Sequence, residues 1–428
     1  MKDKKAFYGW VVVICCTLLA FSVNAMGNNA LSFYVAPVSK TFGVNRATTN
    51  FALFTMGLLT RTIVGLFFGK LAARFGVKPL MVVGLVIALA GYFTYSFASN
   101  ILMIELGSAL YGIAHAIGTL SSYNVIINNW FIKSKGMVLG IINTAVGVGG
   151  MVINPLVGQW ITRYGWNQSF LNTTMLIAAI AIPSLIFVKE SPSQMGQMAL
   201  GAQETNERKA QANRASDAQG PVLTVRRALR MDRFWLLAAV QLLIGFSMGP
   251  CFSNAIAAFL SVGVNAEFVS NVLAVFIAFG VTVGHLTAGW LYDRFGLGTL
   301  MDAAAVIVGI GLILMGVVTA SSPAPLLIFV VICIGYSNTV SLGTLSHMIN
   351  NVLATERADF SGLFGCLFAI QNVGIMIGSP VSGMIFDKTG SYRLAYWISA
   401  LLLIVMLILL RIALRLSKQR QAKTLLSK

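Results

Sequence analysis

The sequence predicts an all-α polytopic membrane protein with about twelve transmembrane helices in two six-helix bundles. Of its 428 residues, 57% are hydrophobic and only 10% are charged, whereas a soluble globular domain carries about 25% charged residues. Apolar runs of roughly 20 residues recur along the whole chain, and each is long enough to cross a bilayer as a helix. One polar segment near the middle divides these runs into two sets of six.

The apolar runs and the polar segment define three regions. The expected spans are 8–37, 47–73, 79–97, 101–126, 136–161 and 170–188, then 234–259, 268–292, 300–318, 325–349, 361–386 and 394–416. Residues 189–233 are polar and of low complexity, so they cannot bury a core and are expected to form a solvated cytoplasmic linker. A short amphipathic helix is expected near Val222–Arg230. The domains are therefore an N-terminal bundle (1–188), the linker, and a C-terminal bundle with a basic tail (234–428).

The basic residues predict the orientation of the chain. The formal net charge is +17. If the N-terminus is cytoplasmic, 24 of the 30 Lys and Arg residues fall on the inner side and five on the outer side. Such an excess predicts both termini inside, in a multi-pass protein of the cell membrane. The lipid bilayer then accounts for the charge, and no nucleic-acid partner is needed. We expect a monomer.

Other common functional classes lack support in the sequence. The start, Met1–Lys5, leads into an apolar run without a clear cleavage site, which favours an uncleaved first span over a signal peptide. The five cysteines all lie in apolar runs without metal-ligand spacing, so we expect buried thiols and no metal site. No phosphate-binding loop and no nucleophile–base pair is present, which argues against an enzyme, and no cofactor is expected.

A short motif recurs at four helix ends. Gly69–Gly76 reads GKLAARFG after the second span, and Gly289–Gly296 reads GWLYDRFG after the eighth. A weaker pair, Gly158–Gly165 (GQWITRYG) and Gly383–Gly390 (GMIFDKTG), ends the fifth and eleventh spans. This pattern implies a duplicated bundle built from three-helix units. The candidate gating residues of the motif are Gly69, Arg74, Gly76, Gly289, Asp293, Arg294 and Gly296.

These motifs resemble the major facilitator superfamily over essentially the full chain. The loop after the second span is similar to the signature of that superfamily, glycine–three residues–acid–base–x–glycine–x–base. Ala73 stands where the acid is expected, whereas the second copy keeps Asp293. Phe7–Trp10 (FYGW), Asn129–Gly140 (NWFIKSKGMVLG) and the end of the eleventh span resemble the monocarboxylate-porter and oxalate/formate-antiporter branch. The resemblance implies the superfamily fold, and it leaves the usual charge-relay gate of the first half in doubt.

Arg61 is the exceptional residue of the second span. It lies near the middle of its apolar run, where a charge costs about 3 kcal/mol on insertion scales. Snorkelling relieves charges near helix ends, and Arg61 is too central for that. Its guanidinium offers a planar fork that matches a carboxylate, which predicts an anion-binding residue. The alternative is an internal ion pair, but no acidic residue lies at a similar depth.

The resemblance adds a second argument for Arg61. In the branch named above, an arginine eight residues before the acid of the eighth-span motif, and sometimes a lysine in the eleventh span, hold the substrate anion. Counting back from Asp293 gives His285, and Gln371 falls near the lysine position. Val281 replaces the aspartate that proton-coupled porters carry one turn earlier. Arg61 is thus the fixed cation expected at midplane depth.

Further polar residues could complete a central cavity. The candidate substrate-binding residues besides Arg61 are His115, Tyr123, His285, Gln371, Asn372 and Asn28. His115, Thr119 and Tyr123 follow a four-residue spacing, which predicts one helix face. For each Asn or Gln, an interhelical hydrogen bond is an equally good interpretation. A histidine could bind substrate when neutral or add charge and pH dependence when protonated.

The pattern as a whole predicts a secondary transporter. It would move a small organic anion, such as a monocarboxylate, by alternating access, coupled to proton symport or to exchange for a counter-anion. The alternative within transport is an exporter of drugs or neutral metabolites, for which an acidic, aromatic cavity would be expected. A non-transporting sensor would need an appended soluble domain, and the linker and tail are too short to form one.

Overall fold

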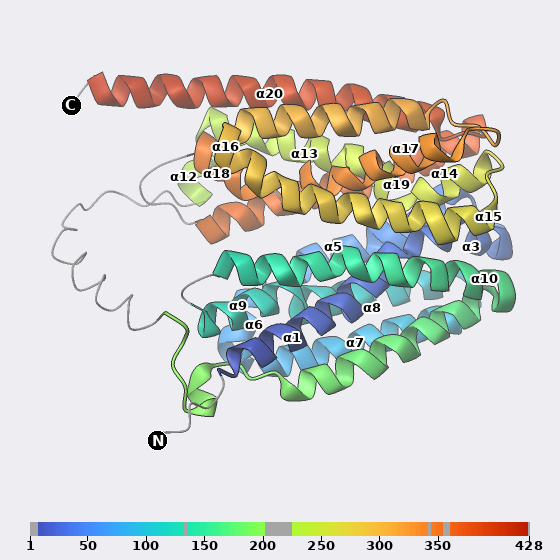
Figure 1. The fold of residues 1–428 in the computed structure, drawn as a ribbon, viewed down its shortest axis with the longest axis horizontal. Helices are drawn as coiled ribbons and strands as arrows, with labels where there is room; N and C mark the ends of the chain where they lie inside the picture. The colour runs from blue at the N-terminus through green and yellow to red at the C-terminus, as the bar shows by residue number, and fades with distance from the viewer. Residues whose placement is uncertain (1–6, 132–134, 202–224, 341–343, 354–359, 427–428) are drawn as a thin grey trace.

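The structure, a computed structural model, describes residues 7–131, 135–201, 225–340, 344–353 and 360–426. Long helices run side by side along the long axis of the molecule (Figure 1). The start of α1, the end of α20 and helix α12 lie at one end, here called the linker end. The opposite end, where α3, α14 and α15 lie, is called the distal end.

The first half of the chain forms one group of helices (Figure 1). Its elements are α1 (Gly9–Leu19), η1 (Ala20–Met26), α2 (Gly27–Asn29), η2 (Leu31–Phe33), α3 (Val35–Phe42), α4 (Arg46–Asn50), η3 (Phe51–Thr55), α5 (Met56–Gly65), α6 (Phe68–Phe75), α7 (Val77–Ser96), α8 (Ile101–Gly118), α9 (Leu120–Trp130), α10 (Lys135–Phe187) and η4 (Pro192–Met195). The segments η1 and η3 are π-helical turns inside the first and second spans.

The second half forms the other group (Figure 1). Its elements are α12 (Val225–Ala228), α13 (Asp232–Ser253), α14 (Ala255–Ser261), α15 (Ala266–Phe268), η5 (Val269–Leu273), α16 (Ala274–Met315), α17 (Ala324–Asn338), α18 (Leu345–Val352), α19 (Phe360–Thr389) and α20 (Arg393–Leu426). The short helix expected near Val222–Arg230 is present as α12, while residues 222–224 lie outside the described part of the chain.

The helices account for twelve passes. Within the described residues, nine helices are long and apolar enough to span a membrane, and a pair bent by 58°, Arg46–Gly65 with Phe68–Phe75, makes a tenth. One of the nine, Val138–Phe187, has 50 residues, about 75 Å of helix, which is far more than a bilayer core of about 30 Å. It turns back at Gly165 and therefore provides two passes. The shorter Ala324–Asn338 completes the set, so the predicted number of spans is confirmed.

The last glycine of every motif copy adopts the same unusual backbone conformation. Gly76, Gly165, Gly296 and Gly390 have φ values of 82°, 83°, 78° and 70°. Residues with a Cβ atom rarely adopt this region, and glycine does so readily. The four turns are therefore alike in backbone geometry, which supports the repeat that the sequence predicts.

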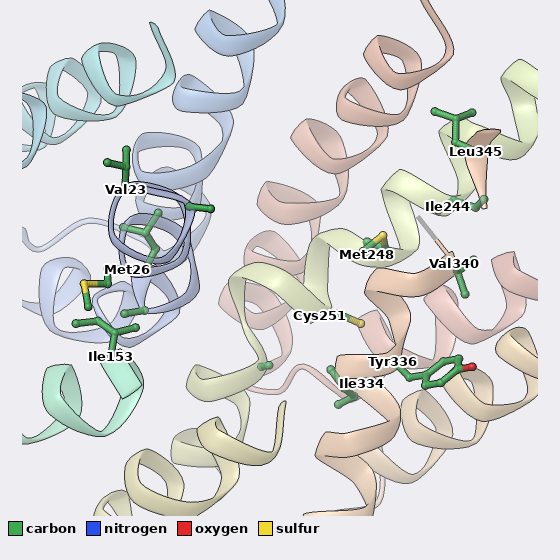
Figure 2. Close-up of a cluster of buried hydrophobic side chains, with 14 of the residues drawn as sticks. Val23, Met26, Ile153, Ile244, Met248, Cys251, Ile334, Tyr336, Val340 and Leu345 are labelled. Atoms are coloured by element: carbon green, nitrogen blue, oxygen red, sulfur yellow. The ribbon is translucent and has the colours of Figure 1, made fainter. Parts of the chain in front are cut away.

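Close helix packing within the halves relies on small residues. Gly245 and Gly249 of α13 face Gly374 and Gly378 of α19, and a Cβ atom at Gly249 would lie 2.6 Å from the carbonyl carbon of Gly378. Paired small residues let membrane helices approach closely when no hydrophobic force drives them together. Buried apolar side chains fill the remaining space: Figure 2 shows Ile244, Met248 and Cys251 beside Ile334, Tyr336 and Val340, and Val23 and Met26 beside Ile153.

The two halves meet at the distal end. Thr55 Oγ1 donates to Met376 O at 3.0 Å, and Asn154 Nδ2 donates to Ala274 O at 3.1 Å. The linker-end half of the same spans differs. Four glycines there, Gly65, Gly69, Gly140 and Gly365, have no atom within 4 Å of the position where a Cβ would stand. The second, fifth and eleventh spans are therefore packed across the halves at the distal end, while these four glycines of their linker-end portions face open space.

Candidate functional site

Arg61 lies halfway along the second span, on α5. Fifteen residues separate it from Arg46 at the start of α4, which is about 22 Å of helix, and Phe75 ends α6 at a similar distance in the other direction. Its side chain is half-buried. Its guanidinium carbon lies 5.7 Å from the ring centroid of Phe368, which belongs to α19 in the opposite half. Arg61 thus faces the boundary between the halves.

No acidic side chain compensates Arg61 within the described structure. The ion pair found in that part of the chain joins Arg411 to Asp302, near the linker end of the second half. The internal ion pair considered as an alternative for Arg61 is therefore not observed among the described residues. The Arg61 guanidinium instead lies over the face of the Phe368 ring, which carries a partial negative charge.

His115 is held inside the first half by a short hydrogen-bonded chain. Its Nε2 lies 2.5 Å from Asn24 Oδ1, and its Nδ1 lies 3.1 Å from Thr119 Oγ1. Asn24 belongs to the π-helical turn η1, and such turns often reposition a functional side chain. The His115 side chain is 4% exposed. It lies near enough to Arg61 for the two groups to interact electrostatically.

The fourth span does not carry one continuous polar face. The helix is interrupted at Thr119, which has φ −118° and ψ −120°, so α8 and α9 are separate helices. The side chains of His115 and Thr119 do contact each other, as the spacing predicts. The break at Thr119 means that the same face does not continue unbroken to Tyr123. Tyr123 lies on α9 and is buried.

The candidate residues of the second half divide into two sets. Asn372 Nδ2 donates to Thr62 Oγ1 at 3.4 Å, which places it beside Arg61 across the boundary. Gln371 is fully buried. Its backbone carbonyl oxygen is the atom that a Cβ atom at Gly245 of α13 would meet first. His285, half-buried on α16, lies beside Asn338 of α17.

Asn28 is the candidate residue of the first span. It belongs to α2 in the first span and is half-buried. Its neighbour Asn29 donates to Val146 O at 2.9 Å. The structure thus brings Arg61 and Thr62 of α5 together with Phe368 and Asn372 of α19.

An acidic residue outside the motif, Glu190, contacts the turn after the second span, and the sequence pattern did not indicate it. Ala73 is exposed, and Arg74 lies over the ring of Phe75 at 5.2 Å. Glu190 Oε1, which follows the sixth span, accepts the backbone N–H of Val77 at 2.9 Å. A carboxylate there satisfies a free N–H at the start of α7 and favours its positive end. Nothing in the motif spacing points to residue 190.

The second copy of the motif is described only in part. Arg294 is exposed and lies 5.7 Å from the ring centroid of Trp290 and 5.5 Å from that of Phe295. The surroundings of Gly289 and the side chain of Asp293, two of the predicted gating residues, lie outside the described part of the structure. Phe368 was also missed at the sequence level, because an aromatic residue in an apolar helix carries no distinguishing signal.

The architecture defines the class of protein. Twelve passes in two halves with repeated turn motifs, and an arginine at mid-depth between the halves, describe a multi-pass membrane transporter. The sequence profile described as the Major Facilitator Superfamily matches residues 17–370 and, in a second match, residues 263–427. The chain belongs to this superfamily. It is accordingly a transporter and not an enzyme, and the resemblance seen in the motifs is confirmed.

Several known proteins are similar to the chain. Monocarboxylate transporter 12 of Rattus norvegicus is 24% identical over 437 residues, covering 95% of this chain and 85% of that protein. A probable sulfoacetate transporter of Cupriavidus necator is 25% identical over 372 residues, covering 82% and 81%. Among solved structures, a D-xylose–proton symporter gives a TM-score of 0.71 at 14% identity, covering 94% of this chain and 97% of the other.

Proposed function

We propose that the chain is a secondary active transporter that moves a small organic carboxylate across the cell membrane, with Arg61 binding the carboxylate. The observation that carries this proposal is the position of Arg61, at mid-depth and facing the opposite half. A guanidinium in that position costs free energy on insertion. Bidentate hydrogen bonds to a substrate carboxylate would offset this cost while the substrate is bound.

The surroundings of Arg61 fit an anion that binds between the halves. Thr62 and Asn372 add polar groups from opposite sides of the boundary. Phe368 supplies an apolar surface next to the guanidinium, which suits the hydrocarbon part of a small organic acid. The names of two similar proteins, a monocarboxylate transporter and a probable sulfoacetate transporter, both denote organic anions, which supports the same substrate class.

The distribution of basic residues supports the orientation. With the linker end in the cytoplasm, both termini and most Lys and Arg residues lie inside. The two halves would then act as domains that rock about a central site, the N-terminal bundle 1–188 and the C-terminal bundle 234–428, joined by the linker 189–233. Contacts that join the halves at the distal end, and open space around four glycines towards the linker end, support an inward-open state of a monomer.

Transport would be coupled to proton symport or to exchange for a counter-anion. His115 and His285 are the residues through which a proton could take part. The ring of His115 is already oriented by Asn24 and Thr119. A bound carboxylate would reduce the repulsion between Arg61 and a protonated His115, so anion and proton would bind together more readily than either alone.

Uptake by purified protein in liposomes tests the assignment of Arg61. Radiolabelled lactate, pyruvate, oxalate and sulfoacetate would be offered with an imposed pH gradient, and separately with unlabelled anion inside. Arg61→Gln should lower uptake of the transported anion at least 100-fold, and Arg61→Lys should keep part of it, because lysine retains charge without the planar fork.

The control is Arg163→Gln, which removes an exposed arginine at the distal end and should leave uptake within a factor of two. Uptake by Arg61→Gln equal to that of the unmodified protein would refute the role of Arg61. Dependence on the pH gradient would indicate proton symport, whereas dependence on internal anion would indicate exchange.

A further inference from the structure

The two halves are joined at the distal end by a cluster of polar contacts from Asp387. Its carboxylate accepts two backbone N–H groups of the opposite half, Arg46 N to Oδ1 and Ala47 N to Oδ2, each at 3.1 Å. Arg46 and Ala47 are the first residues of α4, so the carboxylate caps the start of the second span. Negative charge at a helix start is stabilised by the free N–H groups and by the helix dipole.

Arg46 strengthens the same junction through its side chain. Its Nη1 donates to Tyr392 Oη at 3.0 Å, and its guanidinium carbon lies 3.8 Å from the ring centroid of Phe386. We call Arg46, Ala47, Asp387 and Tyr392 the distal latch. The three hydrogen bonds among these four residues join the first half to the second.

A buried layer of amides lies directly beneath the distal latch. Asn50 Nδ2 donates to Asn254 Oδ1 at 3.1 Å, and Tyr392 Oη donates to the same atom at 3.2 Å. Asn50 and Asn254 are fully buried. Because buried polar groups lose hydrogen bonds when their partners separate, this layer also opposes opening of the distal end.

The latch is built from a copy of the repeated motif. Asp387 is the acid of the eleventh-span copy, and the first glycine of that copy, Gly383, lies against α4. A Cβ atom at Gly383 would be 2.8 Å from Ala47 N, so the close approach requires glycine. At the linker end, the second-span copy differs in two ways. No atom lies within 4 Å of the position where a Cβ atom of Gly69 would stand, and Ala73 occupies the acid position.

We propose that Asp387 holds the distal end closed and that Ala73 leaves the linker end without the matching acid, so the resting protein favours the state open at the linker end. By the repeat that relates the two ends, an acid at position 73 would meet the start of α19 when the linker end closes. The inference rests on the alternating-access mechanism proposed above, and it does not depend on which substrate is carried.

Distance measurements between spin labels test the latch without any substrate. Labels on cysteines at Ser99 and Ser321, both exposed at the distal end of opposite halves, would report opening by double electron–electron resonance in lipid nanodiscs. The full chain would carry serine at its native cysteines. Asp387→Ala should raise the ratio of distal-open to distal-closed molecules about fivefold, as expected for the loss of a helix cap. Asp387→Asn should raise it less, because one oxygen acceptor remains.

Two further variants complete the test. Glu267→Ala removes an exposed carboxylate at the same end, in the first turn of α15, and should leave the ratio unchanged. Ala73→Asp should also raise the ratio, because the added carboxylate would stabilise the state that is closed at the linker end and open at the distal end. An unchanged ratio in both Asp387 variants, or an equal change in Glu267→Ala, would overturn the latch.

An Ala73→Asp protein that stays fully distal-closed would overturn the asymmetry. These readings are independent of the uptake assays for Arg61. The distance distributions can support the latch even if no carboxylate is transported, and failure of the latch would leave the assignment of Arg61 untouched.

Discussion

The two halves of the molecule share a helix plan but differ in their charge at mid-depth. The first half carries Arg61 and the bonded chain of Asn24, His115 and Thr119. The second half contributes neutral groups to the same region, Phe368 and Asn372, while its His285 lies beside Asn338. The two halves repeat the same turn geometry. In the proposed site, the first half provides the charge and the second half provides the surface that faces it.

The largest expected effect comes from moving the cation to the other half. In an Arg61→Gln background, uptake should be lost, and adding His285→Arg should restore it to about a tenth of the original rate. The physical reason is that a guanidinium on α16 would supply from the second half the cation that the first half has lost. Uptake of the identified anion in liposomes provides the measurement. If the double variant is as inactive as Arg61→Gln, an arginine at position 285 cannot take over the role of Arg61.

A second prediction concerns the stability of the first half. Asn24→Ala removes the partner of His115 Nε2, and a buried polar atom left without a hydrogen bond costs about 1–3 kcal/mol. The Tm of the purified protein should fall by several degrees. Asn28→Ala, one turn further along and half-buried, is the matched control and should change Tm by less than a degree. Equal shifts would show that His115 does not depend on Asn24.

A third prediction tests the contribution of the second half. Phe368→Leu keeps the apolar volume approximately but removes the ring that faces Arg61, an interaction of about 0.5–2 kcal/mol. The KM for the anion should change about three- to fivefold, with little effect on Tm. Phe364→Leu, which alters the ring stacked on Phe368 one turn away, should leave KM nearly unchanged. The reverse order of effects would contradict the proposed role of Phe368.

The smallest expected effect lies at the turn between α6 and α7. Glu190→Gln weakens the cap on Val77, at a cost of about 0.5–1 kcal/mol. A thermal melt should detect a drop of one to three degrees. Glu105→Gln, which alters a carboxylate within α8, is the comparison. A larger loss in Glu105→Gln would mean that the hydrogen bond from Val77 to Glu190 does not stabilise the start of α7.

Much of the fold could be predicted because its signals are local. Apolar runs of bilayer length indicate the spans, and the glycines at 76, 165, 296 and 390 mark turns whose backbone requires glycine. Arg61 could be found because a charge at mid-depth is rare. The break at Thr119 could not be predicted, since the small residues around it, such as Gly118 and Ser121, are also common in unbroken membrane helices. Phe368, Glu190 and the Arg46–Asp387 contact depend on residues far apart in the chain, so only the folded structure brings them together.

The four positive-φ glycines have a consequence for how such a chain can diverge. The acid position of the motif has become Ala73, Thr162, Asp293 and Asp387 in the four copies, whereas the closing glycine is the same in each. A backbone requirement is independent of cargo, but a side-chain contact is useful only in some states of the transport cycle. In a saturation mutagenesis experiment, the glycines should tolerate substitution poorly under selection for any substrate, while the acid positions should evolve freely as the direction or rate of transport changes.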